Sequence, residues 1–398
     1  MSRDANDGIR TTLCEAREHL ASWGLKRFTS DEAYFQWQRQ ALSSQELAEL
    51  HRQVEQKRRG SSAEEGAFYD ATAHPRILPV LCSQRFDYYV TVGPRVAARI
   101  GDAQTILDFG CGTGILTTFY AKQFPDRTFL GIDRSPASIF RAMEQATVLG
   151  LKNVRFECRD LMQQALSGAY DLVVATHALV QAEQDPGIPS RDWTTFDRVV
   201  DAAQQRQFEE RTGIGPRLDR LAAALASQGR LIVFEKTRQL ARRVPFQRAL
   251  AARGLVLIEQ PEPIRYLLVE EVTDDGPFYV LRRDGKGNIG WDELPEPDEG
   301  PAVNLLTVAS NHAGSHDPLY ENHHPSAQWA WQKLHQRSVL KEATRKEPDG
   351  RQMHVELGQA DEGVYLYCAN TFDQRQLVIV EAARAAMLEA YYREIMGG

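Results

Sequence analysis

The sequence lacks the features that define several classes of protein. Its 398 residues include five cysteines, an odd number with no CxxC pair, which argues against a disulfide framework and against a structural zinc site. No apolar run approaches the roughly 20 residues that cross a bilayer, and the first residues carry no apolar signal-peptide core. We therefore expect a cytoplasmic protein with no membrane association.

An excess of positive charge is also missing. Lys and Arg total 47 against 54 for Asp and Glu, which gives a formal net charge of -7. A protein that holds nucleic acid through phosphate contacts usually carries a basic excess or a basic stripe. The short basic runs at 57–59 and 242–243 are isolated, so the charge pattern predicts no nucleic-acid partner.

The chain divides into three predicted regions. Residues 1–75 form an expected N-terminal helical cap, because capping-box patterns begin at Thr29 and Ser43 and a surface loop is predicted over 57–63. Residues 76–284 alternate short apolar strands with amphipathic helices, which predicts an α/β fold with a mostly parallel sheet covered by helices on both faces. Its expected strands are 105–107, 128–132, 154–156, 170–175 and 230–234, with 256–259 and 278–281 as an antiparallel edge pair and a helix over 135–149.

Two further segments complete the predicted organisation. The polar stretch 181–215 exceeds an ordinary connection, and together with the N-terminal helices it is a candidate lid. Residues 285–398 are expected to form a small α+β unit whose role the sequence does not define. Its predicted elements are a linker over 285–301, a helix over 326–339, a hairpin around 359–363, a strand over 377–380 and a helix over 382–396.

The segment richest in chemical information is a glycine turn after the first buried strand. It carries Asp108, Gly110, Cys111, Gly112 and Gly114, and a helix is expected to open directly after it. Glycines let the backbone turn sharply and approach a ligand closely, and the helix start offers free amides and a positive dipole end. Dinucleotide binders use GxGxxG, whereas this turn has GxGxG preceded by an acid.

This pattern, with the surrounding order of strands and helices, resembles motif I of the class I, Rossmann-like methyltransferases over about residues 100–284. The resemblance implies S-adenosylmethionine (SAM) as the cofactor. It implies that Asp133, at the tip of the second strand, accepts hydrogen bonds from the ribose hydroxyls. The remaining cofactor-binding positions that it implies are Asp108, Gly110, Cys111, Gly112, Gly114, Arg134, Asp160, Leu161 and Thr176, and Tyr69 from a segment that folds over the cofactor.

Several of these residues also have a purely structural interpretation. Asp108 either contacts the methionine amino group of the cofactor or holds the amides of the turn. His177, at the end of the fourth strand, is a candidate catalytic base or a hydrogen-bonded structural histidine. Cys111 is better explained as a small residue beside the turn than as a nucleophile. The histidines between 312 and 324 match no metal-binding spacing, so no metal site is predicted.

The sequence thus predicts a SAM-dependent methyltransferase whose acceptor is a small molecule rather than a protein. An Asn/Asp-Pro-Pro-Tyr signature is absent after the fourth strand, where Thr176-His177-Ala178-Leu179 stands, which favours an oxygen, carbon or sulfur acceptor. The alternatives are a non-catalytic SAM-binding scaffold that works through its C-terminal unit, a dehydrogenase, and a spermidine-synthase-like enzyme. The oligomeric state stays open, a dimer included.

Overall fold

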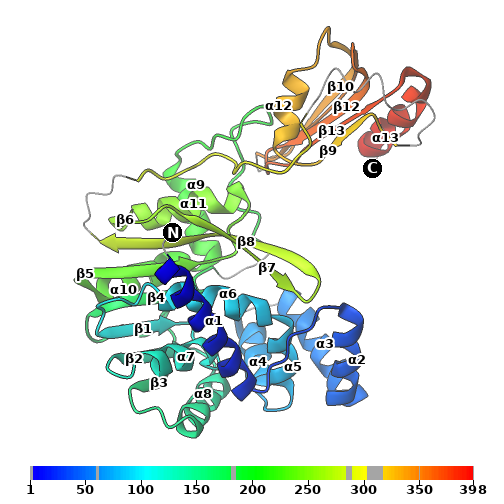
Figure 1. Ribbon diagram of the computed structural model, residues 1–398. Coiled ribbons are helices and arrows are strands. Elements are labelled where there is room, and N and C mark those ends of the chain that lie inside the picture. The colour runs from blue at the N-terminus through cyan, green and yellow to red at the C-terminus, as the bar shows by residue number, and fades with distance from the viewer. Residues whose placement is uncertain are drawn as a thin grey trace. The chain divides into compact units, whose positions relative to one another are not determined.

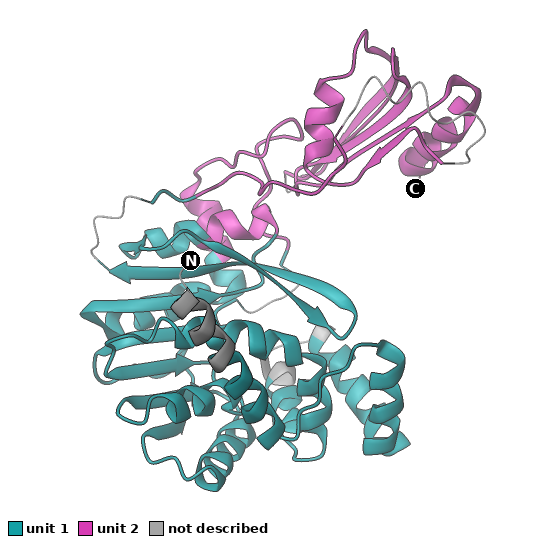
Figure 2. Cartoon of the chain, in the orientation of Figure 1, with its two compact units in different colours: residues 1–185, 209–238, 247–291 teal, residues 186–208, 239–246, 292–398 magenta. Residues whose placement is uncertain are grey.

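The computed structural model describes residues 3–59, 62–180, 185–283, 289–302, 317–348 and 350–397. It divides into two compact units, coloured separately in Figure 2. Unit 1 comprises residues 1–185, 209–238 and 247–291, and unit 2 comprises 186–208, 239–246 and 292–398. The domain limits inferred from the sequence, 1–75, 76–284 and 285–398, stay a prediction.

Unit 1 is built on one eight-stranded sheet (Figure 1). Its strands are β1 (Thr105–Phe109), β2 (Thr128–Asp133), β3 (Val154–Cys158), β4 (Tyr170–Thr176), β5 (Leu225–Phe234), β6 (Leu255–Leu257), β7 (Glu262–Leu268) and β8 (Glu271–Arg283). The helices before and between these strands are α1 (Arg3–Ser22), α2 (Asp31–Ala41), α3 (Ser44–Arg59), α4 (Ser62–Thr72), α5 (Ile77–Gln84), α6 (Phe86–Ala97), α7 (Ile115–Gln123), α8 (Pro136–Val148), α9 (Ala202–Thr212), α10 (Ile214–Ala224) and α11 (Leu240–Ala251).

The strand order is β3-β2-β1-β4-β5-β8-β6, with β7 paired to β8. The first five of these strands are parallel, and β8 runs antiparallel to its neighbours. Ile106 packs with residues of α1, α6 and α7, while Leu107, which points to the opposite face, is also fully buried. Both faces are therefore covered, which confirms the predicted α/β fold class.

Strand β7 was not predicted from the sequence. It starts with Glu262 and Pro263, and a proline normally argues against a strand because it cannot donate a ladder hydrogen bond. β7 tolerates Pro263 near its first residue, where Pro263 lies opposite Pro277 of β8. The hairpin of β7 and β8 turns at the other end of β7, at Val269, a residue in the left-handed region with φ 59°.

The N-terminal segment is helical, as predicted. Ser43 and Glu46 form a capping box, because the Ser43 amide donates to Oε2 of Glu46 at 2.8 Å and the Glu46 amide donates to Oγ of Ser43 at 3.3 Å. The other pattern caps through Ser30, whose Oγ accepts from the Ala33 amide, rather than through Thr29. The predicted loop over 57–63 was too long, since α3 extends to Arg59 and α4 begins at Ser62.

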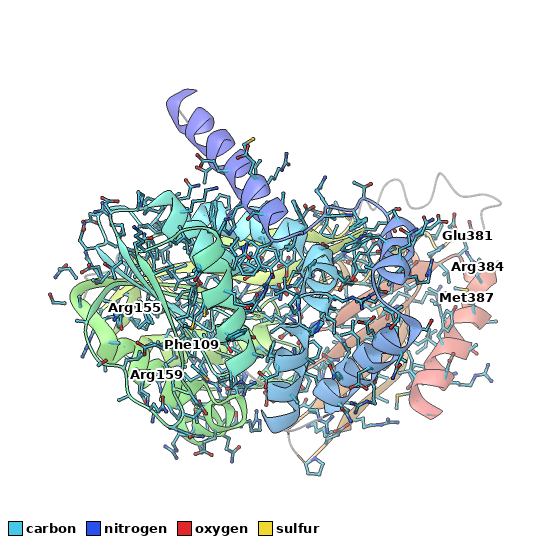
Figure 3. The ribbon with its side chains drawn as sticks, turned by 90° about the horizontal axis from the view of Figure 1, so that it is seen from below. Phe109, Arg155, Arg159, Glu381, Arg384 and Met387 are labelled. Atoms are coloured by element: carbon cyan, nitrogen blue, oxygen red, sulfur yellow. The ribbon has the colours of Figure 1, made fainter. Side chains whose placement is uncertain are left out.

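Unit 2 contains a five-stranded antiparallel sheet in the order β10-β11-β12-β13-β9. The sheet is covered by α12 on one face and by α13 on the other. Figure 3 labels Glu381 and Arg384 just before α13 and Met387 within it, and Nη1 of Arg384 donates to the Asp317 carbonyl at 2.7 Å. The elements are β9 (Tyr320–Asn322), α12 (Ser326–Gln332), β10 (Ser338–Lys346), β11 (Gln352–Ala360), β12 (Gly363–Asn370), β13 (Arg375–Val380), the 3-10 turn Ala382–Arg384 and α13 (Ala385–Gly397).

The predicted hairpin, third strand and final helix of this unit are all present. The predicted helix over 326–339 was wrong at its end, because α12 stops at Gln332 and β10 starts at Ser338. β10 is an edge strand that is exposed along almost its whole length, so it lacks the apolar alternation by which a half-buried strand is found in a sequence.

Part of the 181–215 stretch packs with the C-terminal sheet. The amide of Ser190 donates to the Thr371 carbonyl at 2.8 Å, and the buried guanidinium of Arg198 pairs with Asp373. Residues 186–208 therefore belong to unit 2. Among the described residues, no helix is long and apolar enough to cross a membrane.

Candidate functional site

The three glycines of the turn after β1 all have positive φ, at 70°, 54° and 80° for Gly110, Gly112 and Gly114. An added Cβ at Gly110 would lie 2.3 Å from Cβ of Ala178, and one at Gly114 would lie 2.9 Å from Cβ of Ala142. A Cβ at Gly112 would meet nothing within 4 Å. Two glycines are therefore needed for packing, and the third leaves open space at the start of α7, as a cofactor that approaches the backbone requires.

Asp133 ties the end of β2 to this turn. Its Oδ2 accepts from the Gly112 amide at 3.0 Å and its Oδ1 accepts from the Ser135 amide at 2.8 Å. Burial raises the pKa of the carboxyl above its ordinary value. Each carboxylate oxygen has a second lone pair, and the half-buried side chain keeps part of its surface open, so the geometry fits a carboxylate that also accepts from a vicinal diol.

Asp108 lies beneath the turn. It is 4% exposed and accepts a hydrogen bond of 2.5 Å from Oγ1 of Thr117 on α7. Burial raises its pKa to about 7. The contact with Thr117 is one that holds the turn on its helix, and direct contact with a cofactor stays a prediction. Cys111 packs beside the cluster around Phe156, and burial raises the pKa of its thiol well above the ordinary value, so a thiolate nucleophile is not favoured there.

The loop after β3 borders the same edge of the sheet. The Arg159 amide donates to the Asp133 carbonyl at 2.8 Å, and Oδ1 of Asp160 accepts from the Met162 amide at 2.8 Å. Leu161 is 1% exposed. Arg159 is labelled in Figure 3 just after the edge strand β3, which carries Arg155. The structure thus gathers the predicted residues Asp133, Asp160 and Leu161 at one end of β2 and β3.

Helix α4 brings the predicted N-terminal residue to this end of the sheet. Oδ1 of Asp70 accepts from Oγ of Ser135 at 2.6 Å, at the start of α8. The Tyr69 ring lies 6.0 Å from the guanidinium of Arg134. Tyr69, Arg134 and Asp133 therefore lie in one neighbourhood, as a segment that folds over the cofactor requires.

At the end of β4, Thr176 leads into the candidate base His177, which has an unusual backbone conformation and a charged side chain beside each ring nitrogen. Its φ is 55°, which costs on the order of 1 kcal/mol for a residue with a Cβ, and its amide donates to the Phe234 carbonyl at 2.8 Å. Nδ1 lies 2.6 Å from Nη2 of Arg85, and Nε2 lies 3.1 Å from Oδ2 of Asp275, without the alignment of a hydrogen bond. Burial lowers the pKa of His177 to about 4, so the imidazole is neutral at pH 7.

A ring of residues that the sequence did not single out surrounds His177. Tyr88 stacks on the imidazole with centroids 4.9 Å apart, and the Arg85 guanidinium lies 4.5 Å from the same tyrosine ring. The Tyr266 hydroxyl donates to Asp275. Burial alone would raise the pKa of Asp275, but the neighbouring His177 and Tyr266 lower it to about 2. Nothing in the sequence marked Arg85 or Asp275 as functional residues.

Glu235, directly after β5, positions the loop that follows His177. Its Oε1 accepts from the amides of Ala178 and Leu179, both at 2.7 Å. Burial raises its pKa to about 7. Because an added Cβ at Gly110 would touch Ala178, this carboxyl holds the loop that packs directly on the glycine turn.

Comparison with known proteins agrees with this geometry. The sequence model of a methyltransferase domain matches residues 100–283. Trans-aconitate 2-methyltransferase of Deinococcus radiodurans is 40% identical over 88 residues, which are 22% of this chain and 32% of that protein. Malonyl-[acyl-carrier protein] O-methyltransferase of Acetivibrio thermocellus is 32% identical over 101 residues, 23% of this chain and 35% of that protein.

Among solved structures, magnesium protoporphyrin IX methyltransferase from Synechocystis PCC 6803 with bound SAM covers 50% of this chain and 84% of its own, at 18% identity and a TM-score of 0.36. The chain spans about a third of the length of the first two curated relatives. With the glycine turn, the β2 acid and the matched domain together, residues 100–283 form a methyltransferase domain of the class I family, which uses S-adenosylmethionine.

Proposed function

We propose that this protein methylates an oxygen of a small, negatively charged acceptor, and that Arg85 binds the charge of that acceptor. The proposal rests on one observation above all. Arg85 is half-buried beside the end of β4, and within the described residues no carboxylate lies within ion-pair distance of its guanidinium. The hydrogen bond that it makes there runs to the neutral ring of His177.

A half-buried cation without an anionic partner is costly, because desolvation disfavours the charged form and arginine does not give up its proton. Such a group is a candidate for a functional site. Asp275 lies on the other side of the imidazole, 3.1 Å from Nε2 of His177. It therefore interacts electrostatically with Arg85 across the ring but is not in direct contact with the guanidinium. A carboxylate on the acceptor would supply the missing direct partner.

The chemistry of an anionic oxygen suits the residues present. When bound, SAM supplies the methyl group, and its sulfur keeps the electron pair of the broken carbon–sulfur bond. An ionised carboxylate forms the new oxygen–carbon bond with a lone pair and has no proton to lose, so a catalytic base is unnecessary. The positive charge of the sulfonium and the negative charge of the acceptor disappear together, and exclusion of water favours such a step.

His177 takes a positioning role in this proposal. A neutral imidazole has one lone pair, and here Nδ1 uses it to accept from Arg85. A base would need that lone pair, so the action of His177 as a base stays a prediction that requires Arg85 to move away. The positioning role needs no movement, because the same hydrogen bond fixes the guanidinium.

The names of two relatives accord with an acidic acceptor, since trans-aconitate and the malonyl group both carry carboxylates. Other relatives are named for tRNA and for release factor glutamine. Arg85, and not the relatives, therefore carries the proposal.

The test is steady-state kinetics with a panel of small carboxylic acids, each beside its neutral amide. We expect turnover with acids and not with amides. Arg85→Gln is expected to raise KM for the acid by roughly 10- to 100-fold, the worth of a charge-assisted hydrogen bond, with little change in SAM affinity. Arg27→Gln is the matched control, because Arg27 is an exposed arginine already paired with Asp87.

Three outcomes would contradict the proposal. Equal turnover of acids and amides would remove the role of the acceptor charge, and an unchanged KM in Arg85→Gln would remove the role of Arg85. Tight binding of SAM without turnover of any acid would favour the non-catalytic SAM-binding scaffold instead.

A further inference from the structure

Three side chains of unit 2 meet on one face of its sheet. Glu342 on β10 lies directly opposite Glu356 on β11, and His354 lies two residues before Glu356 on the same strand. Cross-strand partners, and residues two apart on a strand, share a face. One ligating atom from each of the three side chains lies within 4.8 Å of the other two.

His354 has a free nitrogen aimed into this group. The residue is 2% exposed, and its Nε2 has no hydrogen-bond partner in the structure. Nδ1 lies 2.8 Å from Oγ1 of Thr344, and the ring of Trp193 stacks flat on the imidazole, with centroids 3.6 Å apart and an interplanar angle of 1°. The ring is thus fixed on one edge and one face while Nε2 is left unsatisfied, at a cost of about 1–3 kcal/mol.

Glu356 is held so that one oxygen is free. Its Oε1 accepts from Nε1 of Trp331 at 3.1 Å and from the hydroxyl of Tyr365 at 2.5 Å. Its Oε2 faces Nε2 of His354 at 3.7 Å. The hydrogen bonds to Oε1 therefore hold the carboxylate so that Oε2 lies toward His354.

The spacing between His354 and Glu356 suits a shared ion better than a direct contact. At 3.7 Å the nitrogen and oxygen are too far apart for a hydrogen bond. Two ligands bound at about 2.0–2.1 Å to one tetrahedral ion lie about 3.4 Å apart. The third group, Glu342, is exposed on the edge strand, so it offers both a mobile carboxylate and a route from solvent.

We propose that Glu342, His354 and Glu356 bind a divalent transition-metal ion, with Zn²⁺ as the reference, and that water completes its coordination. One imidazole and two carboxylates are suitable ligands for such ions. Nδ1 of His354, held by Thr344, and Oε1 of Glu356, held by Trp331 and Tyr365, supply the outer contacts that orient metal ligands. Such an ion links the edge strand β10 to β11 through Glu342 and gives Nε2 of His354 the partner that it otherwise lacks.

This site differs from the histidine-rich stretch that the sequence drew attention to. Residues 311–316 lie outside the described residues, and His323 pairs with Glu321 at 2.6 Å on the surface. The three proposed ligands were hidden because His354 and Glu356 are the polar half of an alternating strand and Glu342 lies 12 residues upstream of His354. The sequence predicted no metal site, and this proposal departs from that expectation.

The test uses the full chain, stripped with a chelator and titrated calorimetrically with Zn²⁺. We expect one ion per chain. Glu342→Gln is expected to weaken binding at least 10-fold while the metal-free unfolding midpoint stays near that of the wild type, since the residue is exposed. Thr344→Val is expected to weaken binding roughly 10-fold through the outer contact. His323→Gln removes the exposed surface histidine and is expected to bind as the wild type does.

Tryptophan fluorescence provides a second readout. Trp193 and Trp331 touch the ligand residues His354 and Glu356, so Co²⁺ is expected to quench part of the emission in the wild type and not in Glu342→Gln. Binding of no ion, unchanged affinity in Glu342→Gln, or loss of binding in His323→Gln would each overturn the proposal. These readouts do not depend on methyl transfer.

Discussion

The glycine turn allows one structural feature to be varied while backbone conformation is held constant. Gly110, Gly112 and Gly150 all have φ between 54° and 70°. Alanine at any of the three positions is expected to destabilise the protein by about 1–2 kcal/mol, because a residue with a Cβ is disfavoured in the left-handed backbone conformation. They differ in what the added methyl group meets, which is Cβ of Ala178 at 2.3 Å for Gly110 and nothing within 4 Å for the other two.

The expected losses of stability follow from these contacts. Gly150→Ala and Gly112→Ala are each expected to lose about 1–2 kcal/mol, and Gly110→Ala about 2–5 kcal/mol, because overpacking adds about 1–3 kcal/mol. Gly150→Ala and Gly112→Ala are expected to differ in their affinity for the cofactor. Gly150 follows α8, away from the turn, whereas the open space over Gly112 is where we propose that the cofactor approaches. Only Gly112→Ala should combine a small loss of stability with a loss of affinity of 10-fold or more.

The assay pairs urea unfolding midpoints with calorimetric titration of S-adenosylhomocysteine. The comparison relies on the order of the midpoints, because a chain with two compact units need not unfold in two states. Equal affinity for S-adenosylhomocysteine in Gly112→Ala and Gly150→Ala would refute the placement of the cofactor over Gly112. A midpoint of Gly110→Ala equal to that of Gly150→Ala would refute the packing argument.

Three further changes have defined outcomes. His19 is 1% exposed and burial lowers its pKa to about 4, so its contribution to stability is present above pH 6.5 and lost as the pH falls through 4. His19→Gln should therefore remove up to about 3 kcal/mol of the stability that is lost in acid, as measured by unfolding midpoints from pH 7 to 4. For Glu235 the dependence of stability on pH has the opposite sign, because burial raises its pKa to about 7. The stability that Glu235 contributes below pH 4.5 is lost as the pH rises through 7, so Glu235→Gln should make the unfolding midpoint less dependent on pH between 5 and 8. Asp373→Asn should destabilise unit 2 by about 3–5 kcal/mol in thermal unfolding, because it removes the carboxylate partner of the buried Arg198. A pH dependence of the midpoint equal to that of the wild type in His19→Gln or Glu235→Gln, or an unchanged midpoint in Asp373→Asn, would contradict the respective prediction.

The sequence predicted the elements whose local pattern matches their environment. The strands of the parallel sheet are apolar because both faces are covered, and the GxGxG spacing identified the turn because three positive φ angles require glycine. Strands β7 and β10 were missed, since one starts with a proline and the other is an exposed edge. In both, tertiary pairing outweighs local preference.

The surroundings of His177 show the limit of prediction from sequence. Arg85 comes from the junction of α5 and α6, and Asp275 comes from β8, so only the folded chain brings them to the two edges of one imidazole. Each is an ordinary charged residue in its own segment. Neither spacing nor composition distinguishes them from surface charges.

The most direct test of the central assignment is calorimetric titration of the chain with SAM, S-adenosylhomocysteine and NADH. Asp133→Asn removes the charge at the end of β2 and keeps an oxygen for the turn amides. Asp171→Asn is the matched control. Asp171 lies at the start of β4, at the opposite end of that strand from Thr176, and its carboxylate accepts from the amides of Gln104 and Thr105. We predict that both adenosyl compounds bind the wild type and Asp171→Asn, that Asp133→Asn binds them at least 10-fold more weakly, and that NADH does not bind. Binding of NADH in place of the adenosyl compounds, or equal affinity in the two variants, would contradict the account.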